Sequence, residues 1–253
     1  MAESFGADAE RYDRARPSYP TALVERIVAA SPGREVLDVG CGTGIVARLL
    51  AAAGCRVLGI DPDARMAALA RQRGLEVEVS AFETWDPAGR AFDAVVAGQA
   101  WHWVDPAAGA ARAAQALRPG GLLVLFWNAF QPPPDVAEAF ADVHSRVMAG
   151  AQPDFWTRPI VDLYLAMCAK AAAGMRQAGR FGEAEQWRFD WERHYTRDEW
   201  LDQVPTFGGN SQLPAGQREA LLTGMGAAID AAGGSFVMRY ATVAVTAART
   251  GAA

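Results

Sequence analysis

The sequence predicts an α/β fold with a doubly wound, mostly parallel sheet of seven strands, an antiparallel edge strand and a helical cap insert. The first observation is the rhythm between residues 35 and 127, where short apolar segments alternate with amphipathic ones. Such alternation is typical of parallel strands joined by helices that cover both faces of a sheet. The second observation is a break at residues 131–134, Gln-Pro-Pro-Pro, after which helical segments and two further strand-like segments follow.

The expected elements follow the chain in a regular order. Parallel strands are expected over five short apolar ranges, 35–39, 56–60, 76–80, 91–97 and 121–127. Helices are expected over the ranges 21–30, 43–53, 63–73 and 106–117. The segments 185–196 and 236–248 read as two later strands that form an antiparallel edge, with helices at 197–204 and 214–232 between them.

We expect a single domain, residues 1–253, made of four segments. These are an N-terminal arm with a helix (1–34), the core (35–130), the helical cap insert (131–185), and the strands and helices that complete the sheet (186–253). Pro17 and Pro20 keep the arm from forming a long helix, so it is expected either to pack passively or to fold over a site.

Composition and charge argue against several classes of protein. The net charge of −5 combines 24 basic and 29 acidic residues without a basic tract, which argues against nucleic-acid binding. Cys41, Cys55 and Cys168 are widely spaced and odd in number, which argues against a disulfide framework or a metal site and favours a cytoplasmic location. We expect neither a secretory signal nor a membrane span. A small molecule is the expected partner, and the sequence says nothing of the oligomeric state.

The segment Val36-Leu37-Asp38-Val39-Gly40-Cys41-Gly42-Thr43-Gly44 predicts a buried strand, a tight glycine turn and the start of a helix. Such a turn lets a ligand approach bare backbone, and the helix N-terminus offers unpaired N–H groups. Asp38 lies inside the apolar run, where an unpaired carboxylate is costly, so we expect it to have a fixed partner. About twenty residues further on, Asp61 ends the second strand, where an acid can accept both hydroxyls of a ribose.

Two interpretations of the cofactor are compatible with Asp61 at this position. A dinucleotide fold uses the pattern G-x-G-x-x-G, but Ile45 occupies the position of the third glycine and no Tyr-x-x-x-Lys pattern follows. The run from Asp38 to Gly44, followed by Gly59-Ile60-Asp61-Pro62-Asp63 and Met66, instead resembles the class I S-adenosylmethionine-dependent methyltransferases, which have a Rossmann-like sheet. The segments Tyr-Asp-Arg-Ala-Arg-Pro at 12–17 and Gln-Ala-Trp-His-Trp-Val-Asp at 99–105 are similar to the branch that includes trans-aconitate methyltransferase.

The resemblance implies a role for each matching position. S-adenosyl-L-methionine is the implied cofactor, with residues after the first four strands and in the arm around it: Tyr12, Arg16, Asp38, Gly40, Cys41, Gly42, Asp61, Pro62, Met66, Ala81, Phe82, Glu83, Gln99 and Ala100. The third strand departs from the family pattern, because its usual acid is displaced to Glu83. Aromatic side chains are the candidates for a substrate pocket: Tyr19, Trp101, Trp103, Trp127 and Trp156.

The implied activity is methyl transfer to a small-molecule acceptor, an O- or N-methylation by direct in-line displacement. His102 is the candidate catalytic residue, because it follows the fourth strand, although a structural histidine is an equal alternative. Two other functions stay open: a non-catalytic S-adenosylmethionine-binding or regulatory protein, and, less favoured, an NAD(P)-dependent oxidoreductase. The identity of the acceptor is not encoded in any pattern that we can interpret.

Overall fold

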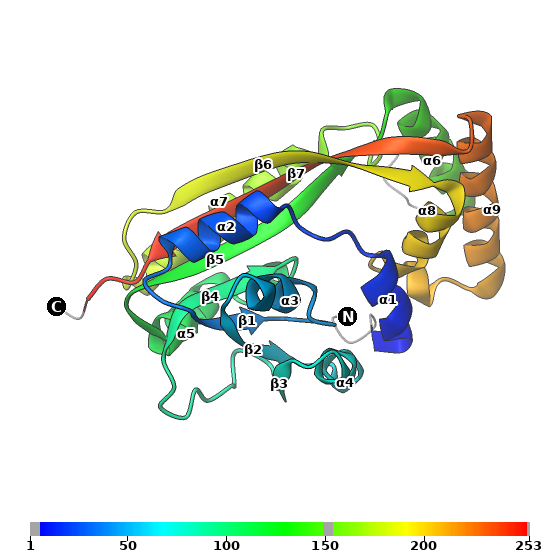
Figure 1. Ribbon diagram of the computed structural model, residues 1–253. Helices are drawn as coiled ribbons and strands as arrows, with labels where there is room; N and C mark the ends of the chain where they lie inside the picture. The colour runs from blue at the N-terminus through cyan, green and yellow to red at the C-terminus, as the bar shows by residue number, and fades with distance from the viewer. Residues whose placement is uncertain (1–5, 149–153, 252–253) are drawn as a thin grey trace.

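The structure is a computed structural model that describes residues 6–148 and 154–251, and one sheet runs through it (Figure 1). Its strands are β1 (Glu35–Val39), β2 (Arg56–Asp61), β3 (Glu76–Val79), β4 (Phe92–Gly98), β5 (Leu117–Gln131), β6 (Glu185–Thr196) and β7 (Ser235–Ala248). They are ordered β3-β2-β1-β4-β5-β7-β6. Strands β1 to β5 pair in parallel, and β7 pairs antiparallel with both β5 and β6. The predicted fold class is confirmed, and its antiparallel strand, β7, lies one position in from the edge strand β6.

Helices connect and cover these strands, and most begin and end within three residues of the predicted positions. They are α1 (Ala9–Ala15), α2 (Thr21–Ala30), α3 (Ile45–Ala52), α4 (Ala64–Gln72), α5 (Pro106–Ala116), α6 (Pro134–Val147), α7 (Ile160–Ala178), α8 (Arg197–Gln203) and α9 (Ala215–Ala231), with 3-10 turns η2 (Trp101–Trp103), η3 (Val204–Thr206) and η4 (Asn210–Gln212). The sequence did not predict α1. Asp8 caps this short helix by accepting a hydrogen bond from the backbone N–H of Arg11, and the helix ends before Pro17.

The alternation of side chains along the central strands produces two apolar layers. Val36, Ala94 and Val96 pack with α2 and α3 on one face of the sheet. Leu37 and Val95 belong to the cluster that holds α5 and α7 on the other face. Because both faces are covered, the strands are buried on both sides and read as continuous apolar runs.

The three longest strands, β5, β6 and β7, project beyond the parallel part of the sheet (Figure 1). Their projecting ends lie on the side where β1 to β4 have their carboxyl ends, since the pairing of β5 with β7 continues to Gln131. A second apolar cluster forms there between the projecting strands and α6, α8 and α9, with Phe140, Trp200 and Met225 fully buried. This cluster, which we call the cap, therefore stands over the carboxyl edge of the sheet.

The predicted insert over 131–185 divides between two places. Helix α6 belongs to the cap, whereas α7 packs against α5 and the sheet. The remaining cap helices, α8 and α9, come from the connection between β6 and β7. A helix in the position of α7 is required to bury the second face of the sheet, which explains why only part of the insert is available as a cap. In the described part of the chain, none of the helices has the length and apolarity to cross a bilayer.

Candidate active site

The glycine turn after β1 has the conformation that the sequence predicts. Gly40, Gly42 and Gly44 have φ values of +67°, +57° and +86°, in the left-handed region that favours glycine. A Cβ on Gly40 would lie 2.4 Å from the Cβ of Ala100, so the backbone of the turn lies against the loop after β4. A side chain on Gly42 would approach Met66 at 3.7 Å and would occupy the space in front of the turn.

A cavity of about 640 Å³ opens at the carboxyl edge of the sheet, between the glycine turn and the cap. Most of the predicted site residues line it: Tyr12, Arg16, Gly40, Gly42, Asp61, Pro62, Met66, Ala81, Phe82, Glu83, Gln99, Ala100, His102, Trp103 and Trp156. Asp38, Cys41 and Tyr19 line a smaller adjoining pocket of about 50 Å³ that shares Gly40, Gly42 and Arg16 with the larger one. Ligands of doubly wound folds bind at this edge.

Asp38 is buried beneath the turn, with 1% of its surface exposed. Its carboxylate oxygens meet no donor within hydrogen-bond distance among the described residues, but the backbone N–H of Ala47 is close enough to lower its pKa. Burial, together with the nearby charge of Asp61, outweighs this contact and raises the pKa of Asp38 to about 8. A buried carboxylate with one weak partner is costly, and a ligand cation would reduce the cost. The expected partner is therefore a backbone N–H of α3, and the contact is weak enough to leave Asp38 available to a ligand.

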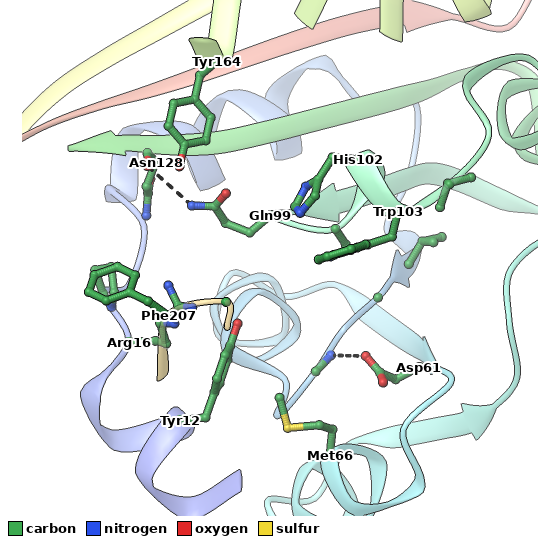
Figure 2. A pocket seen from close by; sticks show the side chains of 18 of the residues that line it. Tyr12, Arg16, Asp61, Met66, Gln99, His102, Trp103, Asn128, Tyr164 and Phe207 are labelled. Atoms are coloured by element: carbon green, nitrogen blue, oxygen red, sulfur yellow. Dashed lines mark hydrogen bonds between the residues drawn. The ribbon is translucent and has the colours of Figure 1, made fainter. Parts of the chain in front are cut away.

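Asp61 ends β2 and connects the turn to the next helix. Its Oδ2 accepts a hydrogen bond from the Gly42 N–H at 2.8 Å (Figure 2). Its Oδ1 accepts one from the Asp63 N–H at 2.8 Å. Burial raises the pKa of this carboxyl, and the two backbone donors oppose the rise. Because each carboxylate oxygen has further lone pairs, Asp61 can still accept hydrogen bonds from a ligand hydroxyl in the cavity.

The arm closes the cavity from the side of the cap. The Arg16 guanidinium lies 5.0 Å from the ring centre of Tyr12 and 5.1 Å from that of Phe207, and its Nη2 donates to the Thr206 carbonyl at 2.5 Å. The Nε of Arg16 is buried and has no partner among the described residues. A cation held between two rings, with a free donor, is suited to bind a carboxylate.

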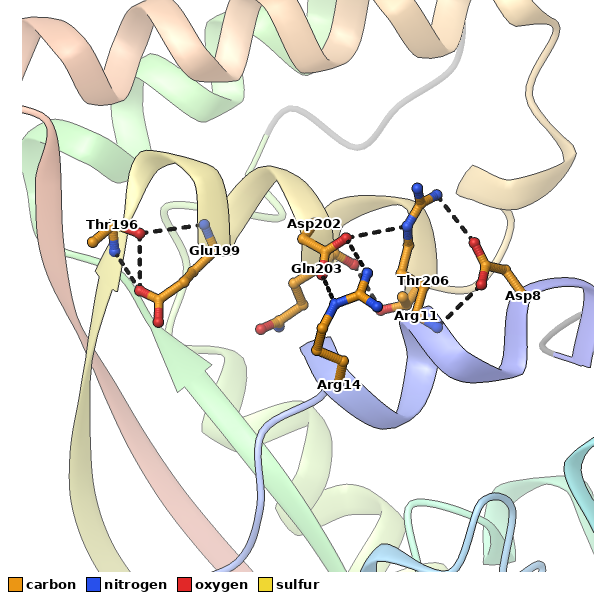
Figure 3. A network of polar contacts seen from close by, with 8 residues as sticks. All are labelled: Asp8, Arg11, Arg14, Thr196, Glu199, Asp202, Gln203 and Thr206. Atoms are coloured by element: carbon orange, nitrogen blue, oxygen red, sulfur yellow. Dashed lines mark hydrogen bonds and ion pairs between the residues drawn. The ribbon is translucent and has the colours of Figure 1, made fainter. Parts of the chain in front are cut away.

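Helix α1 is fixed to the cap by ion pairs. Asp202 of α8 accepts from Arg14 at 2.8 Å and from Arg11 at 3.2 Å (Figure 3). On the opposite side, Asp13 pairs with Arg48 at 2.7 Å and with Arg73 at 3.4 Å. The arm therefore bridges the cap and the helices of the core. This is the arrangement expected of an arm that folds over a site.

The loop after β4 has a strained backbone at the cavity. Gln99 has φ +55°, which is uncommon for a residue other than glycine and marks a candidate functional position. Its amide nitrogen donates to the Asn128 carbonyl at 3.4 Å (Figure 2). The hydroxyl oxygen of Tyr164 also accepts a hydrogen bond from the Gln99 side chain. Asn128 in turn holds the arm, because its amide donates to the Ser18 carbonyl at 3.1 Å.

His102 lies on the same loop and is exposed to the cavity, on the side opposite Tyr12 and Met66 in Figure 2. Its Nδ1 accepts a hydrogen bond from the indole Nε1 of Trp127 at 3.4 Å. The surrounding protein removes bulk water from the ring and lowers the pKa of His102. The lowered pKa favours the neutral imidazole at pH 7, which has one hydrogen bond and a ring contact with Trp103 at 4.8 Å between centroids.

Two predicted substrate residues line neither of these pockets. Trp101 packs in the core beneath the loop, where it contacts Gly109 of α5, and Trp127 is 1% exposed in the same apolar layer. Both were expected to form the pocket wall. The 3-10 turn η2 sends Trp101 inward and leaves Trp103 in the cavity, and the alternation of β5 directs Trp127 to the face opposite Asn128.

Several lining residues were missed in the sequence. They are polar or aromatic side chains contributed mainly by the cap and by β5: Ser80, Asn128, His144, Tyr164, Gln203, Phe207, Asn210 and Tyr240. No spacing rule along the sequence connects them. They come together only because the cap folds back over the sheet.

Comparison with known proteins agrees with this geometry. Residues 37–125 match the family described as a methyltransferase domain. The chain is 40% identical over 131 residues to an uncharacterized methyltransferase of Mycobacterium bovis. The aligned segment covers 51% of this chain and 53% of that protein. It is 38% identical over 93 residues to a trans-aconitate 2-methyltransferase of Mycobacterium ulcerans, covering 36% of this chain and 34% of that protein. The chain thus spans about half the length, or less, of these curated relatives.

A solved structure of a candidate type II methyltransferase from Anaeromyxobacter dehalogenans has the same fold, with a TM-score of 0.61 and 23% identity over 92% of this chain and 97% of that one. The sheet order, the glycine turn after β1 and the acid that ends β2 define the class I methyltransferase fold. The match to a methyltransferase domain over residues 37–125 and the likeness of the whole fold thus agree with the resemblance that the sequence motifs indicate.

Proposed function

We propose that the protein binds S-adenosyl-L-methionine and transfers its methyl group to a small molecule. One observation carries the proposal: Asp38 is buried, has no hydrogen-bond partner at normal distance among the described residues, and lines a pocket together with Gly40 and Gly42 of the glycine turn. A carboxylate in this position fits the ammonium group of an amino acid. A pyrophosphate, the group that a dinucleotide would present there, is repelled by it.

The other residues fit the remaining parts of this cofactor. Arg16 is proposed to bind its carboxylate, Asp61 its ribose hydroxyls, and Pro62 and Met66 the two sides of the adenine. When bound, the cofactor supplies a methyl group already activated on a sulfonium. The methyl–sulfur bond breaks as the bond to the acceptor forms, so the protein needs to align the acceptor and exclude water.

The limited volume of the cavity, about 640 Å³, favours a small acceptor. Its walls come from the core, the arm and the cap, so the space beyond the glycine turn suits a molecule of limited size. The net charge of −5 gives no electrostatic support for binding RNA or DNA. Three buried, unpaired cysteines, Cys41, Cys55 and Cys168, support a cytoplasmic location for the protein.

Calorimetry tests the binding step directly. We expect S-adenosylhomocysteine, the product form of the cofactor, to bind the wild-type protein, and NADH not to compete with it. Binding of NADH in its place would favour an oxidoreductase. Binding of S-adenosylhomocysteine without methyl transfer to any member of a panel of small acceptors would favour the non-catalytic alternative.

A further inference from the structure

The part of the cavity that faces the cap differs chemically from the part at the glycine turn. Around the turn, the lining includes the charged residues Asp61 and Glu83, with Arg16 at the boundary. The lining contributed by the loop after β4 and by the cap has no further charged side chain among the described residues. Residues 149–153, which lie outside the described ranges, contain no Lys, Arg, Asp or Glu in the sequence. We call this half of the cavity the acceptor box.

Two histidines line the acceptor box, and each is bonded to a tryptophan in the same way. The Nδ1 of His102 accepts from the indole of Trp127 at 3.4 Å, and the Nδ1 of His144 accepts from the indole of Trp156 at 2.6 Å. An indole N–H can only donate, so both Nδ1 atoms must carry a lone pair. Burial lowers the pKa of both histidines, which keeps the rings neutral.

A neutral imidazole with an unprotonated Nδ1 carries its single proton on Nε2. Each histidine therefore offers an N–H donor to a ligand, and neither has a lone pair free to accept a proton. The Nε2 of His144 is buried without a partner among the described residues, which is costly until a ligand supplies an acceptor. This geometry argues against His102 as a general base.

A second unsatisfied group in the acceptor box is a hydrogen-bond acceptor. Gln203 is 1% exposed, and its amide bonds to the hydroxyls of Tyr195 and Tyr240, which are 2.8 Å apart. Its Oε1 has no partner among the described residues. The acceptor box thus presents two donors and one acceptor, between aromatic walls: Trp103, Phe130, Phe155, Trp156 and Phe207.

Among the described residues of the acceptor box, no other side chain can take a proton from a hydroxyl. Burial raises the pKa of Tyr164 and, more strongly, that of Tyr240, so both phenols stay protonated. A hydroxyl acceptor would gain from a base, and a carboxylate acceptor would need a cation beyond Arg16, which the cofactor carboxylate occupies. A neutral amine needs neither, because its lone pair attacks the methyl group directly and its proton passes to water afterwards.

We propose that the acceptor is an uncharged arylamine or nitrogen heterocycle, held by the Nε2–H groups of His102 and His144 and by the Oε1 of Gln203. This inference rests on the proposed methyltransferase function. Trp127 and Trp156 act as positioning residues that fix the protonated nitrogen of each imidazole. A polycarboxylate such as the one named for the Mycobacterium ulcerans relative is excluded by the same chemistry.

Long-range proton–nitrogen NMR of the ¹⁵N-histidine-labelled full chain tests the protonation pattern without any substrate. We expect Nε2–H for His102 and His144 at about pH 7.5, and a mixture of the two neutral forms in Trp127→Phe for His102 and in Trp156→Phe for His144. Trp85→Phe is the matched control, because this buried indole donates to Glu78 and lies outside the cavity lining. Nδ1–H in the wild-type protein would overturn the inference.

Three compounds of one size test the acceptor class. Binding to the protein saturated with S-adenosylhomocysteine is measured for 2-aminobenzamide, 2-hydroxybenzamide and 2-aminobenzoate. We expect 2-aminobenzamide to bind at least about tenfold more tightly than the carboxylate and, of the two amides, to be the one methylated when S-adenosylmethionine is supplied. Tighter binding of 2-aminobenzoate, methylation of the phenol alone, or no saturable binding of 2-aminobenzamide up to its solubility limit would contradict it.

Variants of His102 separate donation from base catalysis. His102→Gln keeps an N–H donor at this position, whereas His102→Leu removes it. We expect His102→Gln to retain affinity for 2-aminobenzamide within about tenfold and His102→Leu to lose more than that. Equal losses would refute the donor role. Unaltered binding of S-adenosylhomocysteine in both variants keeps this result separate from a failure of the proposed function.

Discussion

Replacing Asp38 by Asn gives the sharpest test of the site, because one change should stabilise the ligand-free protein and weaken its cofactor binding. The buried carboxylate is a cost in the empty site and a contact in the occupied one. Burial raises its pKa to about 8 in the folded protein, whereas the unfolded chain ionises near the ordinary value of 3.8. Asn removes the ionisation and keeps the size of the side chain.

The sign of the effect follows from where the proton binds. The folded state binds the Asp38 proton more tightly than the unfolded state does. The stability that this proton supplies is therefore fully present below pH 3.8 and is lost as the pH rises towards 8. Each unit of pKa difference corresponds to about 1.36 kcal/mol. Between about pH 5 and pH 7, this single group lowers the free energy of unfolding by roughly 2 to 3 kcal/mol.

Denaturant unfolding of both proteins at the two pH values measures this quantity. At each pH we subtract the free energy of unfolding of wild type from that of Asp38→Asn. We expect this difference to be roughly 2 to 3 kcal/mol larger at pH 7 than at pH 5. Effects of the buried amide itself cancel in this comparison, as does the shared contribution of Asp61. Asp198→Asn, whose side chain is 91% exposed, controls for the change in net charge.

Binding supplies the second half of the test. Loss of a charged hydrogen bond to the cofactor ammonium should cost about 1.5 to 3 kcal/mol, or roughly ten- to a hundredfold in affinity for S-adenosylhomocysteine. A pH dependence that persists unchanged in Asp38→Asn, or a cofactor affinity equal to that of wild type, would refute our reasoning about this carboxylate.

Three further changes test other parts of the site. Asp61→Ala should weaken binding of S-adenosylhomocysteine by at least about tenfold in calorimetry, and an unchanged affinity would overturn the ribose assignment. Gly40→Ala should lower the free energy of unfolding by about 1 to 3 kcal/mol and abolish cofactor binding, because its Cβ would lie 2.4 Å from that of Ala100. Gly89→Ala, also at positive φ but with open space around it, should show the backbone cost alone and bind the cofactor normally. Asp202→Ala should loosen the arm and speed tryptic cleavage at Arg11 and Arg14. The control Asp230→Ala breaks an ion pair away from the arm and should leave the cleavage rate unchanged. Equal cleavage rates in the two variants would mean that the ion pairs of Asp202 do not hold the arm.

Local patterns in the sequence were enough to predict the core of this protein. The alternation of apolar runs and amphipathic helices determines a parallel sheet, because strands buried on both faces and helices with one apolar face have no other way to pack. The turn from Gly40 to Gly44 and the acid Asp61 could be recognised because their chemistry depends on short spacings along one chain. The predicted cofactor residues also had to share one edge of the sheet, because the carboxyl ends of parallel strands meet there.

Tertiary structure alone decided the rest of the site. Which partner Asp38 has depends on neighbours from other strands and helices, and the structure gives it only a weak contact with the backbone N–H of Ala47 in α3. The acceptor box joins His102, which follows β4, to His144 in α6 and Gln203 in α8. The hydrogen bonds from Trp127 and Trp156 that set the histidine protonation connect residues 25 and 12 positions apart. No local pattern encodes such contacts, because they form only when separate elements of the fold pack together.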